Sequence, residues 1–204
     1  MTFNALPLAL TSGDPGGVGP EICLRTALAL RQEHPSVIYG DAVALRARAL
    51  ALGATERDLL VLEPGAVNAL PPGKVGLVDA GVPWSAEALT HRATAAGGLA
   101  QLRALDAAID AVLAQRVRAI VTAPMSKAAV NLAGLPFVGH TEHLARACGL
   151  ADDDVTMMFL GPRLQVALVT THVSIASAPT EITTPRVLRR RGRAQWRLQG
   201  PLSR

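Results

Sequence analysis

The chain has 204 residues, enough for one sizeable domain or for one domain and part of a second. Half of the residues are apolar but only 3% are aromatic, so Ala, Leu and Val must fill the core, as is typical of helices packed on a parallel sheet. The net charge is +4, but residues 189–204 hold six Arg and no acid, and the rest of the chain has 14 basic and 16 acidic residues. A mildly acidic body, and a tail whose one aromatic residue is Trp196, argue against a nucleic-acid-binding protein.

The cysteine content and the N-terminal sequence indicate the cellular compartment in which the protein is expected. Cys23 and Cys148 are too few for a disulfide framework, and no C-x-x-C pair suggests zinc binding or thiol exchange. The N-terminus has no basic segment ahead of an apolar one, and no uninterrupted apolar run reaches about 18 residues. We therefore expect a soluble, cytoplasmic protein that does not contact a membrane.

Strand-like and helix-like segments alternate along the first 124 residues. Residues 6–11 read as a strand, and they are followed by a Gly-rich loop and a helix with Pro20 and Glu21 in its first turn. Further strands are expected at 36–41, 58–64, 74–81 and 117–124, and further helices at 42–53 and 94–116. This alternation predicts an α/β fold with a mostly parallel sheet in three layers.

The remaining residues are less regular. Two short helices are expected at 126–134 and 141–149, and a strand pair at 155–160 and 164–172 is joined by "GPR". A capped helix starts near Pro185, but residues 189–204 show no apolar period. We expect a partial α/β domain over residues 1–188 and a disordered or out-of-frame tail over 189–204.

The loop "SGDPGGVGPE", residues 12–21, lies between a strand and a helix. Its glycines would let backbone N–H groups approach an anion, but it matches neither a Walker loop nor G-x-G-x-x-G, and Gly and Pro are also ordinary turn residues. Asp14 has two interpretations, a site carboxylate or a helix-capping or turn carboxylate, and taken by itself the second is favoured.

Four other polar residues are candidates for chemistry. Lys127 follows the strand "AIVTAP" and His172 closes the strand "LQVALVTTH", at the strand ends where open α/β sheets place ligands. His140 and Thr141 begin a helix, in which Thr141 would serve as the cap. Each residue can also be interpreted without a functional role, as a surface Lys, a helix cap or an inert His. His143 is interpreted as structural, because its i, i+3 spacing from His140 is not the stronger H-x-x-x-H metal pattern. We expect Asp14, Lys127, His140, Thr141 and His172 to converge on one sheet edge from the ends of separate strands.

These segments resemble the 4-hydroxythreonine-4-phosphate dehydrogenases of pyridoxal phosphate synthesis. The matching pieces occur in the family's order: "TSGDPGGVGPEI", "IVTAPMSKAAVNLAGLPFVGHTEHLA", "MMFLGPRLQVALVTTHVSI" and "EITTPRVL". The resemblance implies an isocitrate/isopropylmalate dehydrogenase-like fold, incomplete at the C-terminus, and a homodimer. It also implies NAD- or NADP-dependent oxidation of 4-phosphohydroxy-L-threonine, with decarboxylation to 3-amino-2-oxopropyl phosphate.

The same resemblance gives roles to four residues and leaves the cofactor-binding residues unknown. Lys127 matches a catalytic-site lysine, His140 and Thr141 match a substrate-binding pair, and His172 matches the first of three His ligands of a divalent metal (zinc, magnesium or cobalt). No His follows His172, so the other two ligands are not supplied by later residues. Two alternatives follow: an inactive truncated remnant of the family, and a relative that acts on 4-phosphorylated threonate or erythronate.

Overall fold

The computed structural model describes residues 6–151, 154–171 and 173–199, without the side chains of residues 196–199. The chain divides into two compact units, residues 1–138 (unit 1) and residues 139–204 (unit 2). Each unit is described by itself. Among the described residues, no helix combines the length and the hydropathy needed to cross a bilayer.

Unit 1 is built on a parallel sheet with the strand order β3-β4-β2-β1-β5. Its strands are β1 (Leu8–Thr11), β2 (Ser36–Gly40), β3 (Leu59–Val61), β4 (Val75–Asp79) and β5 (Ala119–Thr122). Strand β1 lies between β2 and the edge strand β5: Leu8 pairs with Ser36 of β2 on one side and with Ala119 of β5 on the other. All five strands were expected from the sequence, and the predicted α/β class with a mostly parallel sheet is confirmed.

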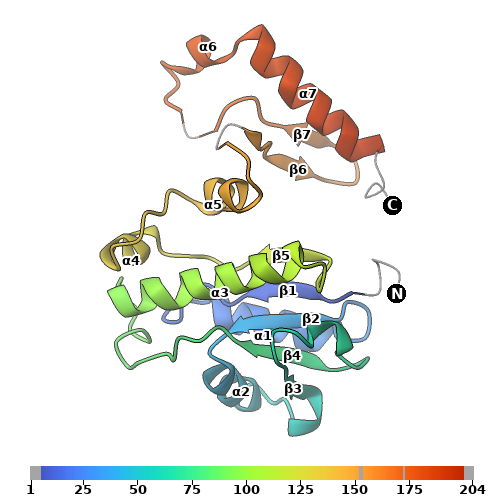
Figure 1. The fold of residues 1–204 in the computed structure, drawn as a ribbon, viewed down its shortest axis with the longest axis vertical. Helices are drawn as coiled ribbons and strands as arrows, with labels where there is room; N and C mark the ends of the chain where they lie inside the picture. Colours follow the sequence, from blue (N-terminus) through green and yellow to red (C-terminus); the bar gives the residue numbers. More distant parts are fainter. Residues whose placement is uncertain (1–5, 152–153, 172, 200–204) are drawn as a thin grey trace. The chain divides into compact units, whose positions relative to one another are not determined.

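Helices cover both faces of this sheet (Figure 1). Helices α1 (Gly19–Leu30) and α2 (Ala42–Ala51) pack on the face that presents Leu10, Ile38 and Leu77. Helix α3 (Ala95–Leu113) packs on the other face, against Ala9, Val37 and Tyr39. Because side chains alternate along a strand, neighbouring residues such as Ala9 and Leu10 serve opposite layers, which gives the expected three-layer arrangement. Two short 3₁₀ turns, η2 (Glu56–Asp58) and η3 (Val67–Ala69), precede β3 and β4.

A fourth helix, α4 (Lys127–Leu132), follows β5 and packs against α3. The contact depends on Gly98, where an added Cβ would lie 2.0 Å from the carbonyl oxygen of Ala129. Only a residue without a side chain lets the two backbones approach so closely. The packing of α3 against α4 therefore explains why a glycine stands at position 98 in an otherwise Ala-rich helix.

The described part of unit 2 combines short elements with one longer helix, α7 (Thr184–Gln199). The short elements are α5 (His140–Ala147), an antiparallel hairpin of β6 (Met158–Leu160) and β7 (Gln165–Ala167), and α6 (Ala178–Glu181). The predicted strand pair around "GPR" is confirmed, but β7 is shorter than expected. It ends at Ala167, so it does not extend as a strand through residues 168–171.

Helix α7 stands where a disordered or out-of-frame tail was expected from residue 189, and residues 200–204 of that tail lie outside the described residues. The helix runs without a break to Gln199 and includes five of the six Arg residues of the segment 189–204. Arg is a good helix former, and Pro185 suits a first turn. Arg186, Arg190 and Arg193, spaced at i, i+4 and i+7, share one face of the helix and bond to Glu181, Thr156 and Asp154. The contacts on this face of the helix are hydrogen bonds and ion pairs, so the spacing of apolar residues does not predict the helix.

Candidate active-site edge

The carboxyl ends of β1 and β5 lie side by side, and the segments that follow them are bonded to each other. The backbone N–H of Asp14 donates to the carbonyl of Pro124 at 3.1 Å, and a Cβ on Gly13 would lie 2.3 Å from the same carbonyl oxygen. Gly13 also has a positive φ of 68°. The structure therefore brings the Asp14 loop and the segment leading to Lys127 to the same sheet edge, as predicted.

The glycines of the loop are explained by contacts within the protein. An added Cβ on Gly16 would lie 1.9 Å from the carbonyl oxygen of Thr90, and one on Gly19 would lie 2.4 Å from that of Ser12. The Asp14 carboxylate accepts the N–H of Gly16 at 3.1 Å, two residues ahead, which is an Asx turn. Asp14 thus forms a turn, as one of its two interpretations predicted, and contacts within the protein account for Gly16 and Gly19.

The start of α1 still offers partial positive charge. Its N-cap, Val18, makes no side-chain hydrogen bond to the first turn, so first-turn N–H groups remain available to an anion. Beneath the loop, Cys23 donates its thiol to the carbonyl of Thr11 at 3.5 Å. Burial raises the pKa of the Cys23 thiol to about 11, so the group is neutral and unsuited to nucleophilic attack.

Lys127 is exposed and is the first residue of α4. Ser126 sets its position, because the Ser126 hydroxyl accepts the N–H of Ala129 at 3.2 Å and so caps the helix. Gln101, fully buried on α3, fixes Ser126 in turn: its side-chain oxygen accepts the N–H of Ser126 at 2.7 Å. Neither positioning residue was predicted from the sequence. Gln101 falls on the buried face of a strongly periodic helix, and that placement was the available signal.

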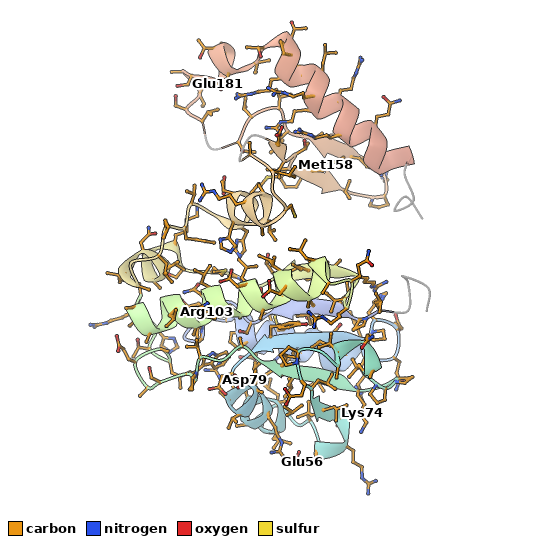
Figure 2. The ribbon with its side chains drawn as sticks, in the orientation of Figure 1. Glu56, Lys74, Asp79, Arg103, Met158 and Glu181 are labelled. Atoms are coloured by element: carbon orange, nitrogen blue, oxygen red, sulfur yellow. The ribbon has the colours of Figure 1, made fainter. Side chains whose placement is uncertain are left out.

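Two further carboxylates follow strands of this sheet, and both have structural partners. Asp41, after β2, accepts N–H groups of Ala44 and Trp84 and caps α2. Asp79, at the end of β4, accepts the N–H of Gly81 at 2.7 Å and lies near the start of α2 (Figure 2). Both carboxylates therefore stabilise local structure at this edge of the sheet.

His140 and Thr141 lie in unit 2 and depart from the expectation in two respects. They open α5, which follows α4 and a loop, so neither lies at the end of a strand. The N-cap is Gly139 and no side chain caps the helix, so Thr141 does not have the predicted capping role. Both residues occupy the first turn, where backbone N–H groups favour an anionic ligand.

Thr141 lines a small cavity of about 60 Å³ together with Arg190 of α7. Arg190 is only 9% exposed, and its guanidinium donates to the hydroxyl of Thr156 at 3.4 Å. A residue that the sequence analysis assigned to an irregular tail thus shares a cavity with a predicted substrate-binding residue. The Arg-rich composition of the segment concealed this role.

The predicted metal ligand, His172, lies outside the described residues. Among the residues that are described, no three His, Cys, Asp or Glu side chains gather into a group able to hold a metal ion. The role of His172 as a metal ligand stays a prediction. The convergence of His140 and Thr141 with Asp14 and Lys127 also stays a prediction, because these pairs belong to different units.

Comparisons with known proteins agree along most of the chain. Residues 31–200 match the family model "Pyridoxal phosphate biosynthetic protein PdxA". The 4-hydroxythreonine-4-phosphate dehydrogenase of Acidithiobacillus ferrooxidans is 39% identical over 202 residues, covering 95% of this chain and 59% of the relative. The same enzyme from Burkholderia vietnamiensis is 39% identical over 190 residues, covering 90% of this chain and 53% of the relative.

Solved structures give the same result for the fold. The 4-hydroxythreonine-4-phosphate dehydrogenase of Klebsiella pneumoniae superposes with a TM-score of 0.81 at 32% identity, covering 96% of this chain and 61% of that one. A terephthalate 1,2-cis-dihydrodiol dehydrogenase of Burkholderia xenovorans superposes less closely, with a TM-score of 0.65 at 31% identity, covering 89% of this chain and 53% of that one. The isocitrate/isopropylmalate dehydrogenase-like fold is therefore confirmed, over a chain that spans slightly more than half the length of these relatives. The chain belongs to the PdxA family, whose curated relatives are 4-hydroxythreonine-4-phosphate dehydrogenases.

Proposed function

We propose that this chain acts in the dehydrogenation of 4-phosphohydroxy-L-threonine, with NAD or NADP as the electron acceptor and with decarboxylation to 3-amino-2-oxopropyl phosphate. The observation that carries the proposal is the sequence identity of 39% to a 4-hydroxythreonine-4-phosphate dehydrogenase over 95% of the chain. The joined carboxyl ends of β1 and β5 support it, because open α/β sheets bind ligands at that edge.

Each predicted residue has a role that its chemistry allows. Lys127, an exposed cation at the start of α4, would stabilise negative charge on a substrate oxygen. His140 and Thr141 would donate hydrogen bonds to the substrate from the first turn of α5. A nicotinamide cofactor would accept the hydride when it is bound. We assign no described residue to the cofactor or to a metal, and His172 is proposed as one metal ligand by resemblance only.

Activity is tested by adding 4-phosphohydroxy-L-threonine to the purified chain with NAD or NADP and following NAD(P)H absorbance, without metal and with zinc, magnesium or cobalt. Lys127→Ala should lower kcat/KM by at least about tenfold, as expected for the loss of a charge that stabilises the transition state. The matched control is Lys74→Ala: Lys74 is the chain's other lysine and bonds to the carbonyl of Arg57.

Two results would contradict the proposal. One is an absence of cofactor reduction by the folded chain under all of these conditions. The other is equal activity of the Lys127 and Lys74 variants, which would remove Lys127 from the site. Parallel assays with 4-phosphorylated threonate and erythronate distinguish the related substrates, since a higher kcat/KM for either of them would reassign the substrate within the same reaction class.

A further inference from the structure

A second hollow lies wholly within unit 1, away from Lys127. It has a volume of about 330 Å³ and lies between the Gly16–Gly17 turn, α1, the end of α2 and the segment 89–91. This volume is at the lower end of the range for small-molecule sites. Its lining is part apolar and part polar, with Ala51, Leu52 and Leu89 beside Arg48, Glu21 and His91.

Arg48 is the decisive residue of this hollow. Its guanidinium stacks on the ring of Trp84, with 5.2 Å from Cζ to the ring centroid, and it donates to the carbonyl of Pro15 at 3.1 Å. These two contacts fix the guanidinium in place while leaving other N–H donors unused. Arg48 is half-buried, yet within the described part of the chain no carboxylate pairs with it. A partly desolvated cation without a counter-charge is costly, and a bound anion would offset that cost.

The other two polar residues of the hollow are already oriented. His91 is held through Nδ1, 2.8 Å from the carbonyl oxygen of Gly16. Because a carbonyl oxygen can only accept, Nδ1 carries the proton. Nε2 of the neutral ring is then an acceptor, which leaves Arg48 as the donor of the hollow to an anion. Glu21 is matched by Arg25 at 2.7 Å on the same helix, so its charge is balanced locally. The unbalanced charge of the hollow is therefore positive.

We infer that this hollow binds a small amphipathic anion, whose phosphate or carboxylate group contacts Arg48 and whose apolar part packs on Ala51, Leu52 and Leu89. The inference goes beyond the proposed dehydrogenation, because none of these residues has a role in that reaction. A binding measurement tests it without any turnover.

The test uses the intact, isotope-labelled chain and phenyl phosphate as the probe, with backbone amide shifts recorded by NMR. Saturable shifts are expected at Gly16, Gly17, Leu52 and His91. Inorganic phosphate and phenol, which each carry half of the probe's chemistry, should each bind at least about tenfold more weakly. The Arg48→Ala variant should lose at least about tenfold in affinity. The matched control, Arg46→Ala, should bind normally, since Arg46 lies on the same helix but pairs with Glu56 instead.

A second variant keeps the inference testable if the Arg48→Ala chain does not fold. Ala51 is exposed at the end of α2, so Ala51→Phe should fill the hollow, leave Arg48 in place and abolish binding. Any of three results would overturn the inference: no saturable shift in the folded wild-type chain, shifts confined to other surfaces such as α7, or equal affinity for the probe and for either of its halves.

Discussion

Gln101 shows how a single buried amide can organise a sheet edge. Its side chain accepts the N–H of Ser126 at 2.7 Å and donates to the carbonyl of Gly97 at 3.1 Å. Gln101→Leu keeps the side-chain size but leaves the Ser126 N–H without its acceptor, at a cost of about 1–3 kcal/mol. We expect the free energy of unfolding, measured in urea, to fall by that amount, and amide exchange at Ser126 to accelerate. Arg103→Leu, at an exposed position of the same helix, is the control. An equal loss in both variants would show that the bridge contributes nothing specific.

The two cysteines should react very differently with a thiol reagent. Cys148 is exposed at the end of α5, whereas Cys23 is 5% exposed beneath the Asp14 loop. The raised pKa of Cys23 further lowers its thiolate fraction at neutral pH. Ellman's reagent should therefore label one thiol quickly in the native chain and the second only on unfolding. Cys148→Ala should remove the fast phase. A fast phase that persists in this variant would show that the Cys23 environment opens readily.

Burial of Cys23 also predicts a loss of stability in alkali. The folded-state pKa of about 11 lies above the ordinary value of 9.0, so the stabilisation is complete below about pH 9 and is lost as the pH rises through 11. The loss should approach roughly 3 kcal/mol, since each pH unit between the two values contributes about 1.4 kcal/mol. Unfolding in urea at pH 8 to 11 measures it, in comparison with Cys23→Ala. Tyr39, whose pKa is raised to about 12 by burial, remains in both chains, so the difference between them isolates Cys23. Parallel pH profiles would contradict the assignment.

At the level of elements, the packing of α3 on α4 depends on the absence of a side chain at Gly98. Gly98→Ala would place a methyl group 2.0 Å from the Ala129 carbonyl oxygen, where backbone would have to move, so a destabilisation of about 1–3 kcal/mol is expected. Gly192→Ala, in α7, is the control: nothing lies within 4 Å of the added methyl, and helix propensity alone should stabilise by up to about 1 kcal/mol. Thermal unfolding measures both variants. Stabilisation of both would show that the close approach at Gly98 relaxes without cost.

The elements of unit 1 were predictable because local pattern and tertiary role coincide there. Strands such as β2, buried along their whole length, read as continuous apolar runs, and α3 has a clear helical period. In α7 the ordering contacts are ion pairs and hydrogen bonds of Arg186, Arg190 and Arg193 to residues elsewhere in the chain, the farthest 39 positions away. No local pattern encodes such partners. The contact of Arg190 was missed for the same reason, whereas the placement of Asp14 and Lys127 at one sheet edge was predictable because both lie in segments that follow strands.

At the level of the whole molecule, the apolar core belongs to unit 1. Both clusters of buried apolar residues are made entirely of residues before position 124. In the described part of unit 2, Ala145 is the one buried apolar side chain, and large apolar residues such as Phe159, Leu164 and Ile175 are exposed. Burial of apolar surface is the main source of folding free energy. Stability should therefore be very unequal between the two units.

A chain ending at residue 138 tests this inequality. It retains every strand of the parallel sheet and both apolar clusters, so we expect it to unfold cooperatively in urea, with a midpoint close to that of the main transition of the 204-residue chain. Limited proteolysis of the whole chain should cut first after residue 138, since local opening costs least where few apolar contacts form. The control ends at residue 115 and so lacks β5, and it should lose cooperativity because β1 would lose one of its two neighbours. A non-cooperative 1–138 chain, or first cleavage within the parallel sheet, would show that unit 2 stabilises unit 1.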